Sequence, residues 1–266
     1  MRWTELQANA NQCLLCGRQA LGSSPHYTNY KSFEKRTGNF LVSLDSQDVF
    51  LGESNNVRKR VKRLMKEASP NNTGEMLSNK EAGMHVQVAY NDLGRKELEE
   101  LNSPDKKMIQ VTENEMAKWE TLQADSLALL TQAHQNMKSM RPCEWTMRQA
   151  DSVAGVYIIF QGNQPIYIDH AANLLTALND HSNNTSQSTF RQMIARNELG
   201  FTLKTQTTET SPYGLYLDRA EEYAVNHYLM DCLVVTMPVT FGRLELAEAM
   251  VNYYAPIFNV KSRKIT

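Results

Sequence analysis

GNFLVSLDSQDVFLGESNNVRKRV, residues 38–61, contains two short apolar runs followed by a strongly basic segment. The runs GNFLVSL (38–44) and DVFLG (48–52) are separated by the turn-forming residues DSQ, a pattern that predicts a β-hairpin. Val57 and Val61 then recur at helical spacing, with basic residues between and after them. The stretch therefore predicts strand, turn, strand and helix in that order.

A second stretch, GVYIIFQGNQPIYIDHAANLLTALNDH (155–181), repeats this order around the turn QGNQ. Both stretches precede further predicted elements: a strand at 85–90 and a long helix at 118–140 after the first, and a strand at 232–239 and a closing helix at 243–256 after the second. Two copies of one order indicate an internal duplication. The boundary is predicted near residues 143–151.

The length of 266 residues is typical of two domains. Residues 1–37 have little periodicity and many polar side chains, which predicts an N-terminal extension ahead of a first domain at 38–145 and a second at 152–266. The net charge of −1 excludes a uniformly basic nucleic-acid-binding surface, so anion binding requires a local patch. The chain has neither an apolar run long enough to span a bilayer nor an apolar signal core at its start, so we expect a cytoplasmic protein without a membrane partner.

Both hairpin stretches resemble the GIY-YIG nuclease motif, especially the form in the N-terminal nuclease domain of the bacterial excision-repair incision subunit. In this family the two strands carry glycine and tyrosine, and the following helix carries an arginine. The second half is also similar to members with a TFR helix (189–191) and a terminal proline and asparagine, here in APIFN (255–259). The resemblance implies an α+β fold of two tandem domains, each a small, mainly antiparallel sheet flanked by helices.

The resemblance also implies roles for particular residues. In the family, tyrosine helps to activate water, arginine contacts the scissile phosphate, and a glutamate holds a divalent metal ion. In the first copy the arginine position is Arg60, but both tyrosine positions are phenylalanine, Phe40 and Phe50. Phenylalanine retains the ring and lacks the hydroxyl group that would act on water.

The second copy has the opposite deficit. Tyr157 and Tyr167 fill the tyrosine positions, and His181 matches a histidine of many members. The arginine position is Ala177, and Asp169 replaces the glycine of the second strand. Each copy therefore has an incomplete catalytic set.

The metal ligands are the least complete part of the pattern. Family spacing from Pro256 leads to Ala247, so Glu248, one residue later, is the candidate Mg²⁺ ligand of an active enzyme. In the first copy, counting back from Pro142 leads to Gln132 and Ala133, neither of which is a good ligand. Separately, Cys13 and Cys16 have the spacing of zinc ligands, but Cys143, His26 or His134 would have to complete the site; the alternative is two reduced thiols.

The basic helix predicted at 56–67 is the main candidate for ligand binding. Its predicted nucleic-acid contacts are Arg58, Lys59, Arg60, Lys62, Arg63 and Lys66. We expect a protein derived from GIY-YIG endonucleases that binds DNA or another nucleic acid, with cleavage impaired or lost. The alternatives are a solvated charged face, an active metal-dependent DNA endonuclease, and a non-catalytic protein that binds a protein partner, such as a decoy or regulator of a nuclease.

Overall fold

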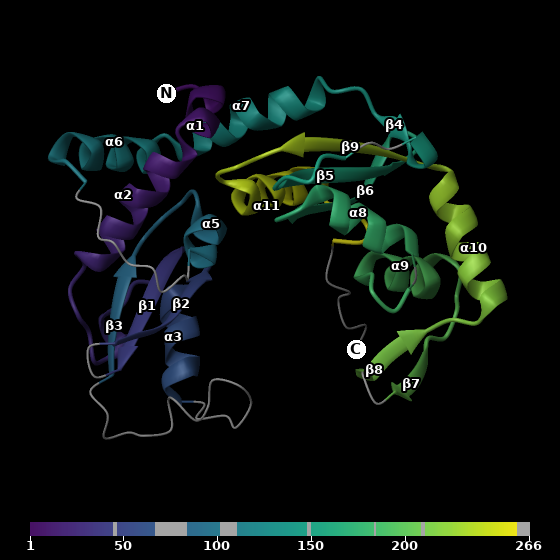
Figure 1. The fold of residues 1–266 in the computed structure, drawn as a ribbon, viewed down its shortest axis with the longest axis horizontal. Helices are drawn as coiled ribbons and strands as arrows, with labels where there is room; N and C mark the ends of the chain where they lie inside the picture. The colour runs from purple at the N-terminus through teal and green to yellow at the C-terminus, as the bar shows by residue number, and fades with distance from the viewer. Residues whose placement is uncertain are drawn as a thin grey trace. The chain divides into compact units, whose positions relative to one another are not determined.

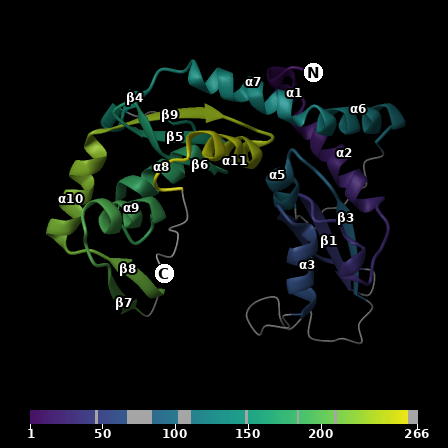
Figure 2. The same cartoon turned by 180° about the vertical axis from the view of Figure 1, so that it is seen from behind.

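The chain folds into two compact units, Met1–Gln132 and Ala133–Thr266 (Figure 1; Figure 2 gives the reverse view). Each unit has an antiparallel sheet with helices packed on it, so the predicted α+β class is confirmed. Among the described residues, no helix is long and apolar enough to cross a membrane. The computed structural model describes residues 1–44, 47–66, 84–101, 111–147, 150–183, 185–208 and 211–259.

The first unit is built on a three-stranded sheet with the order β2-β1-β3, in which both pairings are antiparallel. Part of the predicted turn DSQ and nearly all of the predicted loop at 69–84 lie outside the described residues. The elements in chain order are α1 (Trp3–Ala8), α2 (Ala10–Gly22), η1 (Tyr30–Ser32), β1 (Gly38–Leu44), β2 (Gln47–Ser54), α3 (Val57–Lys66), β3 (Met84–Ala89), α5 (Arg95–Glu100), α6 (Glu113–Ala124) and α7 (Ser126–Lys138).

The sheet of the first unit is covered on both faces because neighbouring side chains of a strand point to opposite sides. Phe40 and Val42 of β1 lie in one buried cluster with Val61 of α3. Leu41 lies in another cluster with Leu21 of α2. Burying a valine or leucine side chain contributes about 1.5–3 kcal/mol, so α3 and α2 both stabilise the sheet directly.

Residues 1–37 were predicted to be an extension, but they form α1, α2 and η1 within the first unit. Trp3, Leu6 and Leu21 are buried. The remaining buried positions of α2 are small residues such as Cys13 and Cys16, so its apolar stripe is weak in the sequence. The helix is therefore stabilised by its packing on the sheet more than by its own pattern.

The division after Gln132 falls within α7, ahead of the predicted boundary at 143–151. In the first half of the helix, the Gln132 side chain accepts a hydrogen bond from the Trp3 amide at 3.0 Å. In the second half, His134 Nε2 lies 3.0 Å from the hydroxyl oxygen of Tyr254. The predicted single helix at 118–140 is divided into two helices at Asp125, whose carbonyl oxygen accepts the first hydrogen bond of α7.

The second unit is built on a four-stranded sheet with the order β4-β9-β5-β6, and β7 and β8 pair separately. Tyr157 and Ile159 of β5 share a buried cluster with Leu178 of α8. α11 packs against β5 and β6. The elements in chain order are β4 (Cys143–Glu144), η2 (Trp145–Met147), β5 (Gly155–Gln161), β6 (Gln164–Ala171), α8 (Leu174–Asn183), α9 (Thr189–Met193), the π-helical turn η3 (Ile194–Glu198), β7 (Lys204–Thr208), β8 (Ser211–Tyr216), α10 (Arg219–Met230), β9 (Cys232–Pro238) and α11 (Arg243–Tyr254).

The two hairpins have the same register. Phe40 pairs with Gly52 in the first hairpin, and Tyr157 pairs with Asp169 in the second. The pairing shifts after Val42 in one and, at the equivalent point, after Ile159 in the other. α3 and α8 then begin at the same separation from the first strand of their hairpin, so the repeated order in the sequence is a repeated backbone path.

The two units also share a second repeated segment, which was not predicted from the sequence. GRKELEE (94–100) follows β3, and GRLELAE (242–248) follows β9. Gly94 and Gly242 both precede their helix in the left-handed region, at φ 83° and φ 86°. In each segment the arginine, the first glutamate and the leucine that follows this glutamate are buried. The counterpart of α11 in the first unit is therefore α5, and not the predicted helix at 118–140.

The glycines that open the two hairpins make one prediction possible. A Cβ atom at Gly38 would meet the carbonyl oxygen of Ala89, and one at Gly155 would meet that of Met237. Because strand backbone cannot move away easily, we expect Gly38→Ala and Gly155→Ala each to lower the free energy of unfolding by about 1–3 kcal/mol. Urea unfolding measures this effect.

Gly22→Ala is the matched control, because nothing lies within 4 Å of a Cβ atom at Gly22. We expect it to leave the stability unchanged or to raise it by about 0.5–1 kcal/mol, since alanine is the better helix former. If Gly38→Ala changed the free energy of unfolding no more than Gly22→Ala does, β1 and β3 would not approach each other as closely as described.

Candidate nucleic-acid interface

The basic helix α3 is held on the sheet by one apolar stripe and begins with a side-chain cap. Val57 and Val61 are buried. Oδ1 of Asn56 accepts a hydrogen bond from the Lys59 amide at 3.0 Å, which satisfies one of the free N–H groups of the first turn. Lys66 ends the helix, and its side chain lies outside the described residues. The other basic side chains project from the remaining surface of the helix.

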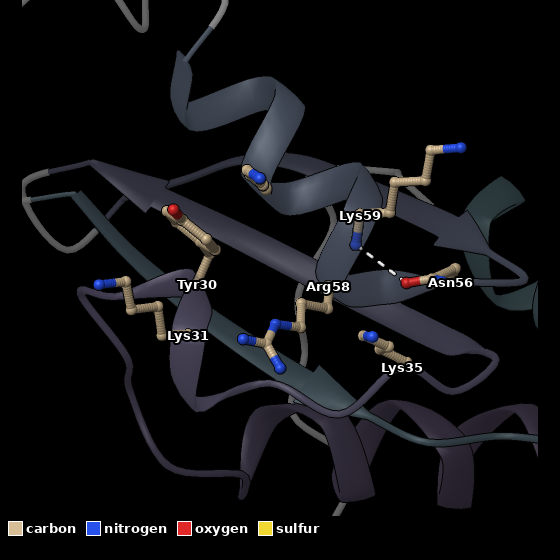
Figure 3. A pocket seen from close by; sticks show the side chains of 7 residues that line it. Tyr30, Lys31, Lys35, Asn56, Arg58 and Lys59 are labelled. Atoms are coloured by element: carbon tan, nitrogen blue, oxygen red, sulfur yellow. Dashed lines mark hydrogen bonds between the residues drawn. The ribbon is translucent and has the colours of Figure 1, made fainter.

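A cavity of about 470 Å³ lies between α3 and the segment around η1 (Figure 3). In this view the guanidinium group of Arg58 lies between the side chains of Lys31 and Lys35, and the Lys31 amine points away from it. Three of the lining residues belong to a segment that the sequence analysis did not connect with α3. The residues that line the cavity are Tyr30, Lys31, Lys35, Asn56, Arg58, Lys59 and Lys62.

Five of the seven lining residues are cationic and none is acidic. Across the described residues, none of the five forms an ion pair with a carboxylate. The neighbouring Arg36, in contrast, lies 3.8 Å from Glu34 and 3.6 Å from Asp92. Lys62 Nζ lies 5.8 Å from the centre of the Tyr30 ring, which favours its position beside the cavity. The cavity is therefore a concentrated site of positive charge.

Arg60, the residue that the family resemblance placed at the scissile phosphate, does not line this cavity. Arg58 and Lys62 are four residues apart and share one side of the helix. Arg60 is two residues from each, so it is turned about 200° around the axis from both. Arg63 is exposed and also lies outside the lining set. Of the predicted contacts on α3, Arg58, Lys59 and Lys62 line the cavity, whereas Arg60 and Arg63 do not.

The first hairpin keeps its aromatic pair without hydroxyl groups. The ring centres of Phe40 and Phe50 are 5.8 Å apart. A Cβ atom at Gly52 would lie 2.7 Å from either ring, so the rings cover the backbone there. The two rings therefore carry no hydroxyl group that could activate water.

The second hairpin brings together three residues predicted to be catalytic. The hydroxyl oxygen of Tyr157 lies 2.7 Å from His181 Nε2, and the Tyr157 and Tyr167 ring centres are 6.2 Å apart. His181 Nδ1 lies 2.6 Å from Ser188 Oγ, which also caps α9. Tyr157, Tyr167 and His181 are all buried. Their polar atoms are therefore engaged with one another inside the unit.

Tyr167 is engaged in the same way. Its hydroxyl group donates a hydrogen bond to Asp169 Oδ2 at 2.7 Å, and its ring stacks on Phe190 with centres 4.7 Å apart. Burial raises the pKa of Tyr157 well above its ordinary value, and burial together with the nearby Asp169 carboxylate raises the pKa of Tyr167. Both shifts oppose formation of a tyrosinate base at neutral pH.

The arginine of the TFR segment stabilises the second unit from the inside. Arg191 is fully buried, and its Nη2 lies 2.6 Å from Glu222 Oε2. Its Nη1 donates to the carbonyl oxygen of His181 at 3.1 Å. Ala177, at the position equivalent to Arg60, packs against the apolar cluster. Neither Arg191 nor Ala177, at the Arg60-equivalent position, therefore provides a guanidinium group on the surface of the second unit.

The predicted metal ligands do not fit metal sites. Among the residues that the structure describes, no three His, Cys, Asp or Glu side chains gather as a metal site would require. Glu248 is half-buried on α11. Cys13 and Cys16 are buried, and burial raises the pKa of the Cys13 thiol to about 11 and also raises the pKa of Cys16. Within the described part of the chain, neither the predicted Mg²⁺ ligand nor the predicted Zn²⁺ ligands belong to a group of three such side chains.

Neither protein-family models nor curated proteins nor solved structures match this chain.

Proposed function

We propose that this protein binds the phosphate backbone of nucleic acid through the cavity between η1 and α3, and that it does so without cleaving the backbone. The observation that carries the proposal is the group of five cations, none paired with a carboxylate of the described residues, around one cavity of about 470 Å³. Lysine and arginine are the residues that usually contact phosphate groups. Arg58 adds the planar, multiply donating group that suits phosphate oxygens best.

The start of α3 supports the same proposal. Asn56, the residue before α3, and Lys59, in its first turn, both line the cavity. The dipole of α3 favours an anion at this end of the helix, and the N–H groups of Val57 and Lys59 already donate to the Arg36 carbonyl oxygen and to Asn56 Oδ1. Phosphate contacts of this kind are independent of base sequence and sensitive to salt.

The proposed loss of cleavage rests on the two hairpins. Their common register and the repeated GR-x-EL segments support descent of both units from one ancestor, which we propose to be a GIY-YIG nuclease domain. The first copy has Phe40 and Phe50 in place of the tyrosines, and the second has Ala177 in place of the arginine. Neither copy retains both groups that the family chemistry requires.

A second candidate is an active, divalent-metal-dependent DNA endonuclease. The contact of Tyr157 with His181, and the Tyr167 ring 5.8 Å from the His181 ring, favour it, because these are the residues expected in a second catalytic copy. Their burial and the raised pKa values of the tyrosines weigh against it.

Titration of a fluorescently labelled DNA duplex and of a labelled single strand tests the proposal. We expect binding at low salt, with log K falling linearly with log salt by about 0.7–0.9 for each phosphate group neutralised. Anisotropy between about 50 and 200 mM salt covers the useful range. An absence of affinity for either DNA at low salt would refute the proposal and leave a protein-binding role.

Incubation of supercoiled plasmid with the protein and Mg²⁺ or Mn²⁺ separates the two candidates. If the protein binds nucleic acid without cleaving it, we expect the plasmid to remain supercoiled. Metal-dependent nicking that Tyr157→Phe abolishes would instead establish the endonuclease.

A further inference from the structure

We propose that the ligand of this cavity is a phosphate monoester, at the end of a nucleic-acid strand or in a free nucleotide, and not the internal diester backbone alone. This inference rests on the proposed function and names the chemical group that the same site prefers. Strands and free nucleotides both carry such a group. The shared chemistry is the monoester, and the experiment below distinguishes the two sources.

The shape of the site supports an end group. The cavity is open to solvent on one side, and its volume of about 470 Å³ lies within the range of small-ligand sites, about 300–1,000 Å³. Its cations come from two walls, α3 with Arg58 and Lys62, and the segment around η1 with Lys31 and Lys35. A continuous backbone that crosses a flat basic helix face would contact one wall only. Two facing walls fit a group that enters the space between them.

The charge of the site supports the same group. The lining has five cations and no carboxylate. An internal diester carries one negative charge, whereas a phosphate monoester carries about 1.5–2 at neutral pH and has three strong acceptor oxygens. Three free oxygens allow contacts to both walls at once. The excess of positive charge is therefore matched better by the monoester than by the diester.

Arg58 is the residue that we expect to distinguish the two groups. Its guanidinium lies in the middle of the lining residues in Figure 3, between Lys31 and Lys35. The fork of N–H donors can bind two oxygens of one phosphate group in parallel. A diester has two of its oxygens linked to sugars, so a terminal group offers more ways to make this paired contact.

Four labelled ligands test the inference with the full-length protein. They are oligonucleotides of one sequence, about twelve nucleotides long, with hydroxyl groups at both ends, with a 5′-phosphate, with a 3′-phosphate, and with both. We expect at least one phosphorylated form to bind about tenfold or more tightly than the hydroxyl form at moderate salt, since charged hydrogen bonds are worth this much. Arg58→Ala should remove this preference, and Arg58→Lys should restore part of it.

Lys118→Ala is the matched control, because Lys118 is exposed on α6 and does not line the cavity. It should keep the preference in full. A circular dichroism spectrum equal to that of the unchanged protein shows that each variant is folded. Equal affinity for all four oligonucleotides would overturn the inference while leaving the proposed function intact, whereas no affinity for any of them would overturn both.

Competition with a nucleoside 5′-monophosphate identifies the source of the group. Displacement at a concentration close to that of the phosphorylated oligonucleotide assigns the cavity to free nucleotides. Displacement only at a far higher concentration assigns it to strand ends. Both results support the monoester, and displacement by a nucleoside without phosphate at the same concentration would contradict it.

Discussion

Reversal of charge at Arg58 and Lys62 together should lower the affinity for nucleic acid by about a hundredfold or more at low salt. Each charged hydrogen bond to phosphate contributes about 1.5–3 kcal/mol, and each glutamate adds repulsion where attraction was lost. The two residues lie one turn apart on the same side of α3 and line the same cavity. Anisotropy titration of Arg58→Glu/Lys62→Glu against the unchanged protein measures the effect.

Arg63→Glu is the informative control for this experiment. Arg63 belongs to the same helix and is exposed, but it does not line the cavity. Charge reversal at Arg63 changes the net charge of α3 and leaves the residues that line the cavity unchanged. We therefore expect the affinity for nucleic acid to fall by about threefold, a fraction of a kcal/mol. If Arg63→Glu weakened binding as much per residue as the pair, the ligand would follow the general charge of the helix, and the cavity would not be the site.

Arg191→Met should destabilise the second unit by about 3–5 kcal/mol, the cost of removing one partner from a buried ion pair. Arg191 is fully buried, while Glu222 remains in place with two hydrogen bonds from Thr185. The carbonyl oxygen of His181 also loses its donor. Urea unfolding followed by circular dichroism measures the loss.

The double variant Arg191→Met/Glu222→Leu tests the reason for that loss. With both charges removed no buried charge is left unpaired, so we expect it to be more stable than Arg191→Met alone. The TFR resemblance would allow Arg191 to contact a ligand instead. A variant that loses nucleic-acid binding and keeps its full stability would contradict the structural role and support that alternative.

The hairpins could be predicted because their evidence is local. Each is two short apolar runs around a turn, followed by apolar residues at helical spacing. α5 could not be predicted in this way. It has six residues, of which five are charged, and its buried residues include Arg95 and Glu97. Charged side chains are usually read as surface, so a helix that buries them leaves no pattern to detect.

Only part of the candidate site could be predicted, because only part of it is local in the sequence. The basic character of α3 is visible in the sequence, and so are Arg58, Lys59 and Lys62. Lys31 and Lys35 are distant in the sequence and become neighbours of α3 only through the packing of η1 on it. Spacing to a family motif selected Arg60, whereas the side of the helix that borders a cavity is decided by tertiary structure.

The matched aromatic pairs make the first hairpin a natural control for the second. Phe40 and Phe50 hold their rings at 5.8 Å and 46°, and Tyr157 and Tyr167 hold theirs at 6.2 Å and 49°. Since phenylalanine fills these positions in one copy, ring volume alone does not account for tyrosine in the other. What distinguishes the second hairpin is the pair of hydroxyl groups that reach His181 and Asp169. The two copies therefore separate, within a single chain, the contribution of ring packing from that of the two hydroxyl groups.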